Sequence, residues 1–407
     1  MKITLRMRTP LWTGGVDGKS NRVQETGVLG SLRWWYEAIV RGLGGYVGSP
    51  ASDNPQKRCE FDTNAYQKAR RAGHPKEEAL AAGLKSLGAV EYLFGATGWA
   101  RLFRLRSLNA PRTSLHFRTT TEINKNWLGR IFGGKEEQNY SIDHLDVIYG
   151  NLDFDVAYRR YDKKYVQSQL ALLLKFITAY GHLGARPQHG FGHIERLWLP
   201  DEMAQETIQD GIETLRSRLE ENAWRTEGPT VATAYNLHNF FHQTYWLADS
   251  VMHRFKTTKT HYGHPDKQEE DAYLPCAFDL RYRGEGGLGL RRWLKEEKGW
   301  KESDSPQELG PLDKLMGPRS QWKNRHGRYV NIDDELRTAS RVYFSMATRA
   351  ENGYKVVVSG FAPPEVIAVD ELMELCEEYM QVLDASPTQK ILGRELLASD
   401  ATGGKTA

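Results

Sequence analysis

The order of hydrophobic and polar residues predicts a recurring set of strands and helices in the first half of the chain. Apolar and polar side chains alternate over residues 2–8, which is typical of a half-buried strand. Apolar side chains then recur at helical spacing over residues 27–42, and glycines follow that helix. Strands are predicted at 100–108, 115–123, 145–158 and 193–199, a helical insertion at 59–92, and a long apolar-striped helix at 164–181. The order is therefore strand, helix, strands, helix, strand.

The same order is less distinct in the second half. A strand is predicted at 278–283, a helix at 288–300, a strand pair at 340–348 and 354–361, and an acidic helix at 370–384, whereas 230–275 gives no clear pattern. A β-α-β-β-α-β order is typical of ferredoxin-like, RRM-like domains. We therefore expect an α+β protein with two tandem ferredoxin-like domains. The expected bounds are 1–225, with an insertion at about 46–92, then 226–398, and a disordered tail at 399–407.

Length and composition narrow the class of protein. The 407 residues suit two domains of about 200 residues each, and 40% hydrophobic residues is a globular value. The sequence has no long apolar run and its first residues do not resemble a signal peptide, so we expect a cytoplasmic chain without membrane contact. Cys59, Cys276 and Cys376 are too far apart to predict a disulfide framework or a zinc ribbon.

Charge is distributed unevenly along the chain, although the net charge is only +3. Residues 98–130 and 317–330 are rich in Lys and Arg, and residues 365–384 are acidic without any Lys or Arg. Such a chain can bind a polyanion on one side and a protein on another, although each run alone is also consistent with ordinary solvated surface.

The sequence at the start of one predicted helix occurs twice in the chain. Residues 28–37 (VLGSLRWWYE) align with 287–296 (GLGLRRWLKE), so that Arg33 matches Arg292 and Trp34 matches Trp293. Leu-Phe-Gly follows the first copy and Leu-Met-Gly follows the second. Paired echoes in the same order indicate two related modules, each with a glycine, an arginine and a tryptophan at this helix.

The first of these helices has two faces. At about 100° per residue, Trp35 falls on the apolar face, and Arg33, Trp34 and Arg41 fall on the other. Trp34 could stack on a base between phosphate-binding guanidinium groups, or it could simply pack against the insertion. Lys19 and Arg22, in the glycine-rich loop before the helix, suit phosphate, although the loop is not a P-loop.

The stretch GHLGARPQHGFGHI at 181–194 is a second candidate. Gly184, Gly190 and Gly192 surround Arg186 and His189, and such a loop can press its main chain against a sugar–phosphate backbone. His189 is also a candidate general base for RNA cleavage. His238 and His242 stand at helical spacing for a metal, but no third ligand is evident, so we expect no metal site.

These motifs together resemble the RAMP proteins of CRISPR systems. We call the stretch at 181–194 the glycine loop. The similarity is greatest to the first RAMP subunit of the Cmr (type III-B) RNA-targeting complex, and it lies in this loop and in TPLWTGG (9–15), ETGVLGSLRWWYEAIVRG (25–42) and YLFGATGWARLFRL (92–105). The resemblance covers most of residues 1–200 and returns at 275–296 and 312–361.

The resemblance implies a non-catalytic subunit without cofactor, which holds the 3′ part of a guide RNA and helps capture target RNA beside other Cmr subunits. It implies RNA contacts at the residues named above, which are Lys19, Arg22, Arg33, Trp34, Arg41, Gly184, Arg186, His189, Gly190, Gly192, Arg292 and Trp293. The alternative is a metal-independent, guide-processing endoribonuclease of the RAMP type, and a third possibility is a purely structural assembly subunit.

Overall fold

The structure is a computed structural model of the chain. It describes residues 1–14, 20, 22–54, 57–118, 141–159, 161–221, 224–225, 227–228, 233, 235–252, 273–274, 276–282, 289–303, 305, 307–318, 321–323, 329–331 and 334–398. Lys19, part of the expected strand at 115–123 and the tail at 399–407 lie outside these residues.

The first module has the predicted order of elements. A four-stranded antiparallel sheet has the strand order β2-β5-β1-β6, made of β1 (Lys2–Met7), β2 (Phe103–Asn109), β5 (Asn151–Tyr158) and β6 (Ile194–Trp198). Helices α1 (Glu25–Gly42) and α6 (Lys163–Tyr180) cover its inner face. The alternation in β1 is confirmed, because Ile3, Leu5 and Met7 are buried.

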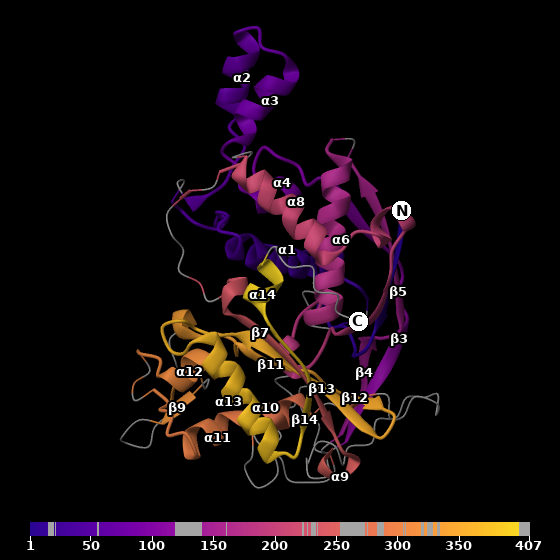
Figure 1. The fold of residues 1–407 in the computed structure, drawn as a ribbon, viewed down its shortest axis with the longest axis vertical. Coiled ribbons are helices and arrows are strands. Elements are labelled where there is room, and N and C mark those ends of the chain that lie inside the picture. Colours follow the sequence, from indigo (N-terminus) through magenta and orange to yellow (C-terminus); the bar gives the residue numbers. More distant parts are fainter. Residues whose placement is uncertain are drawn as a thin grey trace.

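The helical insertion is also confirmed. It consists of α2 (Thr63–Arg71), α3 (Lys76–Leu84) and α4 (Ala89–Phe94), and the α2–α3 hairpin projects from the rest of the molecule (Figure 1). No residue of α2 is buried. The hairpin β3 (Arg112–Arg118) and β4 (Ser141–Ile148) stands beside the first sheet, and α7 (Asp201–Ala204) and α8 (Ile208–Glu220) follow β6.

The second module is built on a six-stranded sheet with the order β14-β7-β13-β12-β8, in which β11 also pairs with β13. Its strands are β7 (Phe240–Leu247), β8 (Tyr273–Leu274), β11 (Val342–Phe344), β12 (Ala347–Ala350), β13 (Gly353–Phe361) and β14 (Ser386–Leu392). Its helices are α9 (Asp249–Met252), α10 (Ala277–Tyr282), α11 (Leu290–Glu296), α12 (Pro311–Met316), α13 (Val369–Val382) and α14 (Gly393–Leu397). Short 3-10 turns lie at Pro187–His189 (η2), Leu237–Asn239 (η3) and Asp334–Leu336 (η5), and β9 (Gln321–Lys323) pairs with β10 (Tyr329–Asn331).

One sequence-based expectation in this module is wrong. Residues 278–283 were expected to form a strand, but they overlap helix α10, in which Ala277 and Leu280 are buried at helical spacing. Asp279 and Arg281 are buried as well, so the apparent alternation of apolar and charged residues does not correspond to an inner and an outer face. The hairpin turn before Gly353 and the acidic helix are confirmed.

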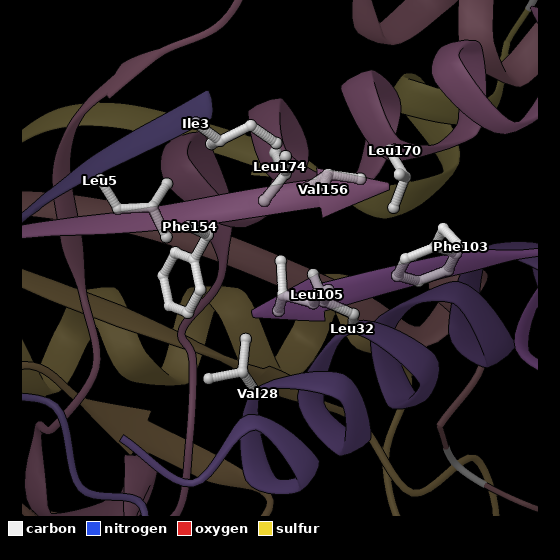
Figure 2. A pocket seen from close by; sticks show the side chains of 10 residues that line it. All are labelled: Ile3, Leu5, Val28, Leu32, Phe103, Leu105, Phe154, Val156, Leu170 and Leu174. Carbon is white, nitrogen blue, oxygen red and sulfur yellow. The ribbon is translucent and has the colours of Figure 1, made fainter. Parts of the chain in front are cut away.

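Each module has a hydrophobic core, and each core takes residues from the other module. Trp12 and Phe191 of the first module lie in the second core, and Phe240 and Phe361 of the second module lie in the first. A small cavity between the first sheet and helices α1 and α6 is lined only by hydrophobic side chains, so it offers no group for chemistry (Figure 2). No helix in the described part of the chain is both long and apolar enough to cross a membrane.

The second sheet turns a polar face toward the first module. Strand register places His242 opposite Ser359, and Tyr343 lies opposite the same Ser359, so these side chains share one face. The ring of Tyr343 lies 5.2 Å from that of His182, and the ring of His242 lies 5.4 Å from that of Tyr180. The opposite face of this sheet packs on α13 and the second core.

Candidate nucleic-acid interface

Arg33 lies at the centre of an ion-pair network on α1. Its Nε donates to Glu37 at 3.0 Å, and its Nη2 donates to Glu91 of α4 at 2.8 Å. Glu37 also pairs with Arg41, whose Nη2 lies 3.2 Å away. Glu91 is buried, and that burial raises its pKa while Arg33 opposes the rise. The two arginines expected to contact phosphates are therefore already matched by carboxylates of this chain.

The second module repeats this arrangement through Arg291. Its Nη1 donates to the carbonyl oxygen of Gly317 at 2.6 Å, and its Nη2 donates to Asp313 and to Glu302. In the first module the corresponding carbonyl is that of Gly95, 3.5 Å from Arg33 Nη1. We call each of these an arginine clasp, because the arginine joins its own helix to a second, short helix that ends at a glycine.

The clasps correct the register of the repeated helix start. Arg33 corresponds to Arg291 and not to Arg292, which is exposed and pairs only with Glu296 of its own helix among the described residues. In this register Trp293 matches Trp35, and both belong to hydrophobic cores. The expectation of an exposed stacking surface at Arg292 and Trp293 is therefore wrong for the tryptophan, which is only 7% exposed.

Trp34 packs inside an aromatic cluster between the modules. Its ring lies 5.2 Å from Tyr235, 5.4 Å from Phe361 and 6.1 Å from His182, centroid to centroid. It also meets the edge of Trp35 at 4.8 Å. Trp34 is partly buried, and the ring partners described for it come from both modules and not from the insertion. Base stacking by Trp34 therefore stays a prediction.

The glycine loop presses against this protein's own main chain. A Cβ at Gly184 would lie 2.4 Å from the oxygen of Trp12, one at Gly190 would lie 2.3 Å from the nitrogen of Met346, and one at Gly192 would lie 1.8 Å from the oxygen of Leu183. All three have positive φ angles. Glycine at these positions is therefore explained by close packing against the protein's own main chain, across the module boundary at Gly190 and within the first module at Gly184 and Gly192. Their expected contact with RNA stays a prediction.

The loop nevertheless presents Arg186 and His189 at the boundary between the modules. Arg186 has φ of 65°, which is rare for a residue with a side chain, and its guanidinium lies 4.1 Å over the ring of Trp12. Arg22 is exposed in the loop before α1, where Thr13 Oγ1 donates to its carbonyl oxygen.

Basic side chains and one tyrosine gather along this boundary, which we call the seam. The seam consists of Arg8, His182, Arg186, His189 and His193 from the first module and His242, Arg281, Arg341, Tyr343 and Lys355 from the second. Several of its nitrogens are buried and lack a hydrogen-bond partner within the described residues: Nη1 of Arg186, Nδ1 of His189, both ring nitrogens of His182, Nε2 of His193, and Nε and Nη1 of Arg341.

Burial and like charge act together in the seam. Burial lowers the pKa of His182 to about 3 and that of His242 to about 4. The pKa of His189 is held well below its usual value by burial first, and then by Arg281 and Arg186. Burial also lowers the pKa of Arg186. The imidazoles are therefore neutral near pH 7 and can donate hydrogen bonds, and the arginines supply the positive charge. Such a site favours an anion, because a buried guanidinium cation is costly until a counter-charge arrives.

Other chemistry has less support in the described residues. His238 lies in η3 and His242 in β7, so the two do not share a helical face. No group of three His, Cys, Asp or Glu residues suited to a metal occurs in the parts of the chain that the structure describes. Burial raises the pKa of Cys59 and Cys276 to about 12, so neither thiol is a ready nucleophile.

Sequence reasoning found part of the seam and missed the rest. Arg186 and His189 were expected from their glycine-rich surroundings, and the histidines of the same stretch could have been included because they crowd together. Arg8, Arg341 and Lys355 follow no local motif, since they meet only through the pairing of distant strands.

The RAMP superfamily matches residues 4–195. Cmr1 from Pyrococcus furiosus in its apo crystal form is 15% identical, with a TM-score of 0.41 over 95% of this chain and 98% of that one. A chain of type III-B Cmr-beta bound to cognate target RNA is 11% identical, with a TM-score of 0.39 over 94% of this chain and 99% of that one. No curated protein matches.

TM-scores this low do not by themselves establish a shared fold, so the assignment rests on the family match. That match spans the first module from β1 to β6, including α1 and the glycine loop. Residues 4–195, just under half of the chain, are therefore similar to the RAMP superfamily.

Proposed function

We propose that the chain is a non-catalytic, single-stranded RNA-binding subunit of a type III-B (Cmr) CRISPR effector, which holds guide RNA and helps capture target RNA. The observation that supports this most is the seam, where buried guanidinium and imidazole nitrogens lack partners among the described residues. RNA supplies a row of phosphates, and such groups bind arginine strongly. The match of residues 4–195 to the RAMP superfamily and the motif resemblance are consistent with this role.

We also infer that both modules are ferredoxin-like. The first sheet has the strand order β2-β5-β1-β6 with α1 and α6 as the two helices. In the second, β14-β7-β13 and the β11–β12 edge repeat this order, with α11 and α13 in the helix positions. The two arginine clasps support the duplication, because they join equivalent helices in each half.

Within the seam, we assign RNA contact first to Arg186 and Arg341. Arg186 stacks on Trp12, and Arg341 lies 5.6 Å over the ring of Tyr235, so both guanidinium groups are held in place before a ligand arrives. Each has a buried nitrogen without a partner among the described residues. Preorganised donors lose little conformational entropy on binding a phosphate.

The test is the affinity of the full chain for a fluorescein-labelled single-stranded RNA, measured by fluorescence anisotropy at several salt concentrations. We expect Arg186→Gln with Arg341→Gln to weaken binding at least tenfold and to lower the slope of log K against log[salt] by about 0.7 per lost phosphate contact. The matched control is Arg71→Gln with Lys85→Gln, two exposed cations of the insertion. Equal losses in both double variants would exclude the seam as the binding surface.

The endoribonuclease alternative assigns the general base to His189. Its depressed pKa keeps the imidazole neutral at pH 7, as a base must be, but Nδ1 is buried. Incubation of the purified chain with repeat RNA separates the two proposals. We expect intact RNA, and clean cuts that disappear in His189→Ala would favour the enzyme.

A further inference from the structure

At one end of the seam four basic side chains from four separate segments come together. Arg8 follows β1, His193 precedes β6, His242 lies on β7 and Lys355 on β13. The main-chain nitrogen of Arg8 donates to the oxygen of His193 at 2.8 Å, which fixes these two residues side by side. His242 and Lys355 share the polar face of the second sheet, because Ser359 lies opposite His242 and Lys355 has the same parity as Ser359 along β13.

The charge of Arg8 disfavours the protonated form of the other three groups. Arg8 acts on His193, His242 and Lys355, and in each case it lowers the pKa in addition to the larger effect of burial. The acid that acts on Arg8 is Glu195, which already pairs with Arg6 at 2.9 Å. The cluster thus concentrates positive charge where burial disfavours it.

His193 has a ring nitrogen available for one more partner, whereas both ring nitrogens of His242 already have one. Nδ1 of His242 faces the carbonyl oxygen of Tyr180 at 3.3 Å, and its Nε2 faces the hydroxyl of Thr244 at 3.4 Å. Nε2 of His193, a residue 5% exposed, is buried and has no hydrogen-bond partner within the described residues. His193 is faced by His182 from the end of α6, 6.3 Å between ring centroids, by Arg8 and by His242.

We propose that Arg8, Lys355, His193 and His242 form a phosphate-binding pocket that takes one phosphodiester of a bound single strand. Arg8 and Lys355 are the half-exposed groups and supply the charge, whereas His193 is buried and supplies a directed donor. The pocket is distinct from the Arg186–Arg341 end of the seam, so a strand that fills both would cross the boundary between the modules. This inference deepens the proposed function and rests on it for the source of the phosphate.

Two measurements on the full chain test the pocket. The first is NMR of histidine-labelled protein titrated with inorganic phosphate alone. We expect the signals of His193 and His242 to move in the wild type and in Arg186→Gln with Arg341→Gln, and to stay fixed in Arg8→Gln with Lys355→Gln. Signals that stay fixed in the wild type, or that move equally in the Arg8 and Lys355 variant, overturn the pocket.

The second measurement is RNA affinity by anisotropy. Arg8→Gln with Lys355→Gln is expected to weaken binding about tenfold and to lower the salt slope by about 0.7, with Lys85→Gln as the unaffected control. RNA ending in a 3′-phosphate and RNA ending in a 3′-hydroxyl should bind equally, whereas a requirement for the terminal phosphate overturns the assignment to a phosphodiester.

The two proposals fail separately. An unchanged RNA affinity in the Arg8 and Lys355 variant, with a loss in the Arg186 and Arg341 variant, overturns the pocket and leaves RNA binding intact. A wild-type chain that binds no RNA, but whose His193 and His242 signals respond to phosphate, overturns the proposed function and supports the pocket.

Discussion

At the scale of the residue, arginines of the repeated helix start form ion pairs within the protein, where contacts to RNA phosphates were expected. Arg33 and Arg291 each bridge two helices through a carboxylate and a glycine carbonyl oxygen. Their partners Glu91 and Asp313 are buried, so loss of either arginine leaves a buried charge without compensation. The arginines that the repeated helix start made conspicuous are therefore fold determinants.

The neighbouring pair Arg291 and Arg292 offers a direct test of this distinction. Arg291→Met is expected to lower the free energy of unfolding by about 3–5 kcal/mol, because the buried Asp313 would lose its guanidinium partner. Arg292→Met should change it by less than about 1 kcal/mol, because its partner Glu296 is exposed. Urea denaturation followed by circular dichroism measures both, and similar losses in the two variants contradict the clasp.

The sequence alignment matched Arg33 with Arg292 instead of Arg291 for a physical reason. Arg33 pairs with Glu37 one helical turn later, and Arg292 pairs with Glu296 at the same spacing, so the two look equivalent along the sequence. The contacts that distinguish Arg291 come from a segment far along the chain, and helical periodicity does not contain them. By contrast, the burial of Trp35 followed directly from its angle on the helix.

At the scale of the element, the glycine loop acts as the joint between the modules. Its turn η2 packs against β11 and α10 of the second module, and Phe191 inserts into the second core. Gly190 approaches the main chain of Met346 so closely that no side chain fits. The glycines hold Arg186 and His189 in position, and their own contacts are with protein.

Gly190→Ala compared with Gly44→Ala isolates this close approach. Both glycines have φ near +80°, but a Cβ at Gly44 meets nothing within 4 Å, whereas one at Gly190 lies 2.3 Å from a backbone nitrogen. Gly44→Ala should cost about 1 kcal/mol from backbone strain alone, and Gly190→Ala about 1–3 kcal/mol more. Equal decreases in the midpoint temperature of unfolding for the two variants would contradict this, because they would show that the loop accommodates a Cβ at Gly190 without additional cost.

Strand prediction succeeded for β1, where one face is solvated, and failed for β7, where both faces are covered. Strand β1 alternates and was recognised, whereas nearly every side chain of β7 is buried, including His242, Gln243 and Thr244. A polar residue in β7 does not mark an exposed face, because the first module covers that side of the sheet. The period of two was therefore absent from the sequence, and the strand could not be read from it.

At the scale of the whole molecule, the seam exists only because the two modules are joined. Its groups come from both halves, and the boundary is fixed by shared cores and by the aromatic cluster around Trp34. The family resemblance predicted functional residues in α1 and in the glycine loop, but it did not predict the basic seam residues of the second module. The proposed function requires that RNA binds at the seam.

Ultraviolet crosslinking of the full chain to single-stranded RNA, with the crosslinked peptides identified by mass spectrometry, tests that claim most directly. We expect crosslinks in the segments around Arg8, Arg186 and Arg341, which meet at the seam. Crosslinks confined to the outer face of the first sheet, around Arg6 and Arg106, with none at the seam, would contradict the account.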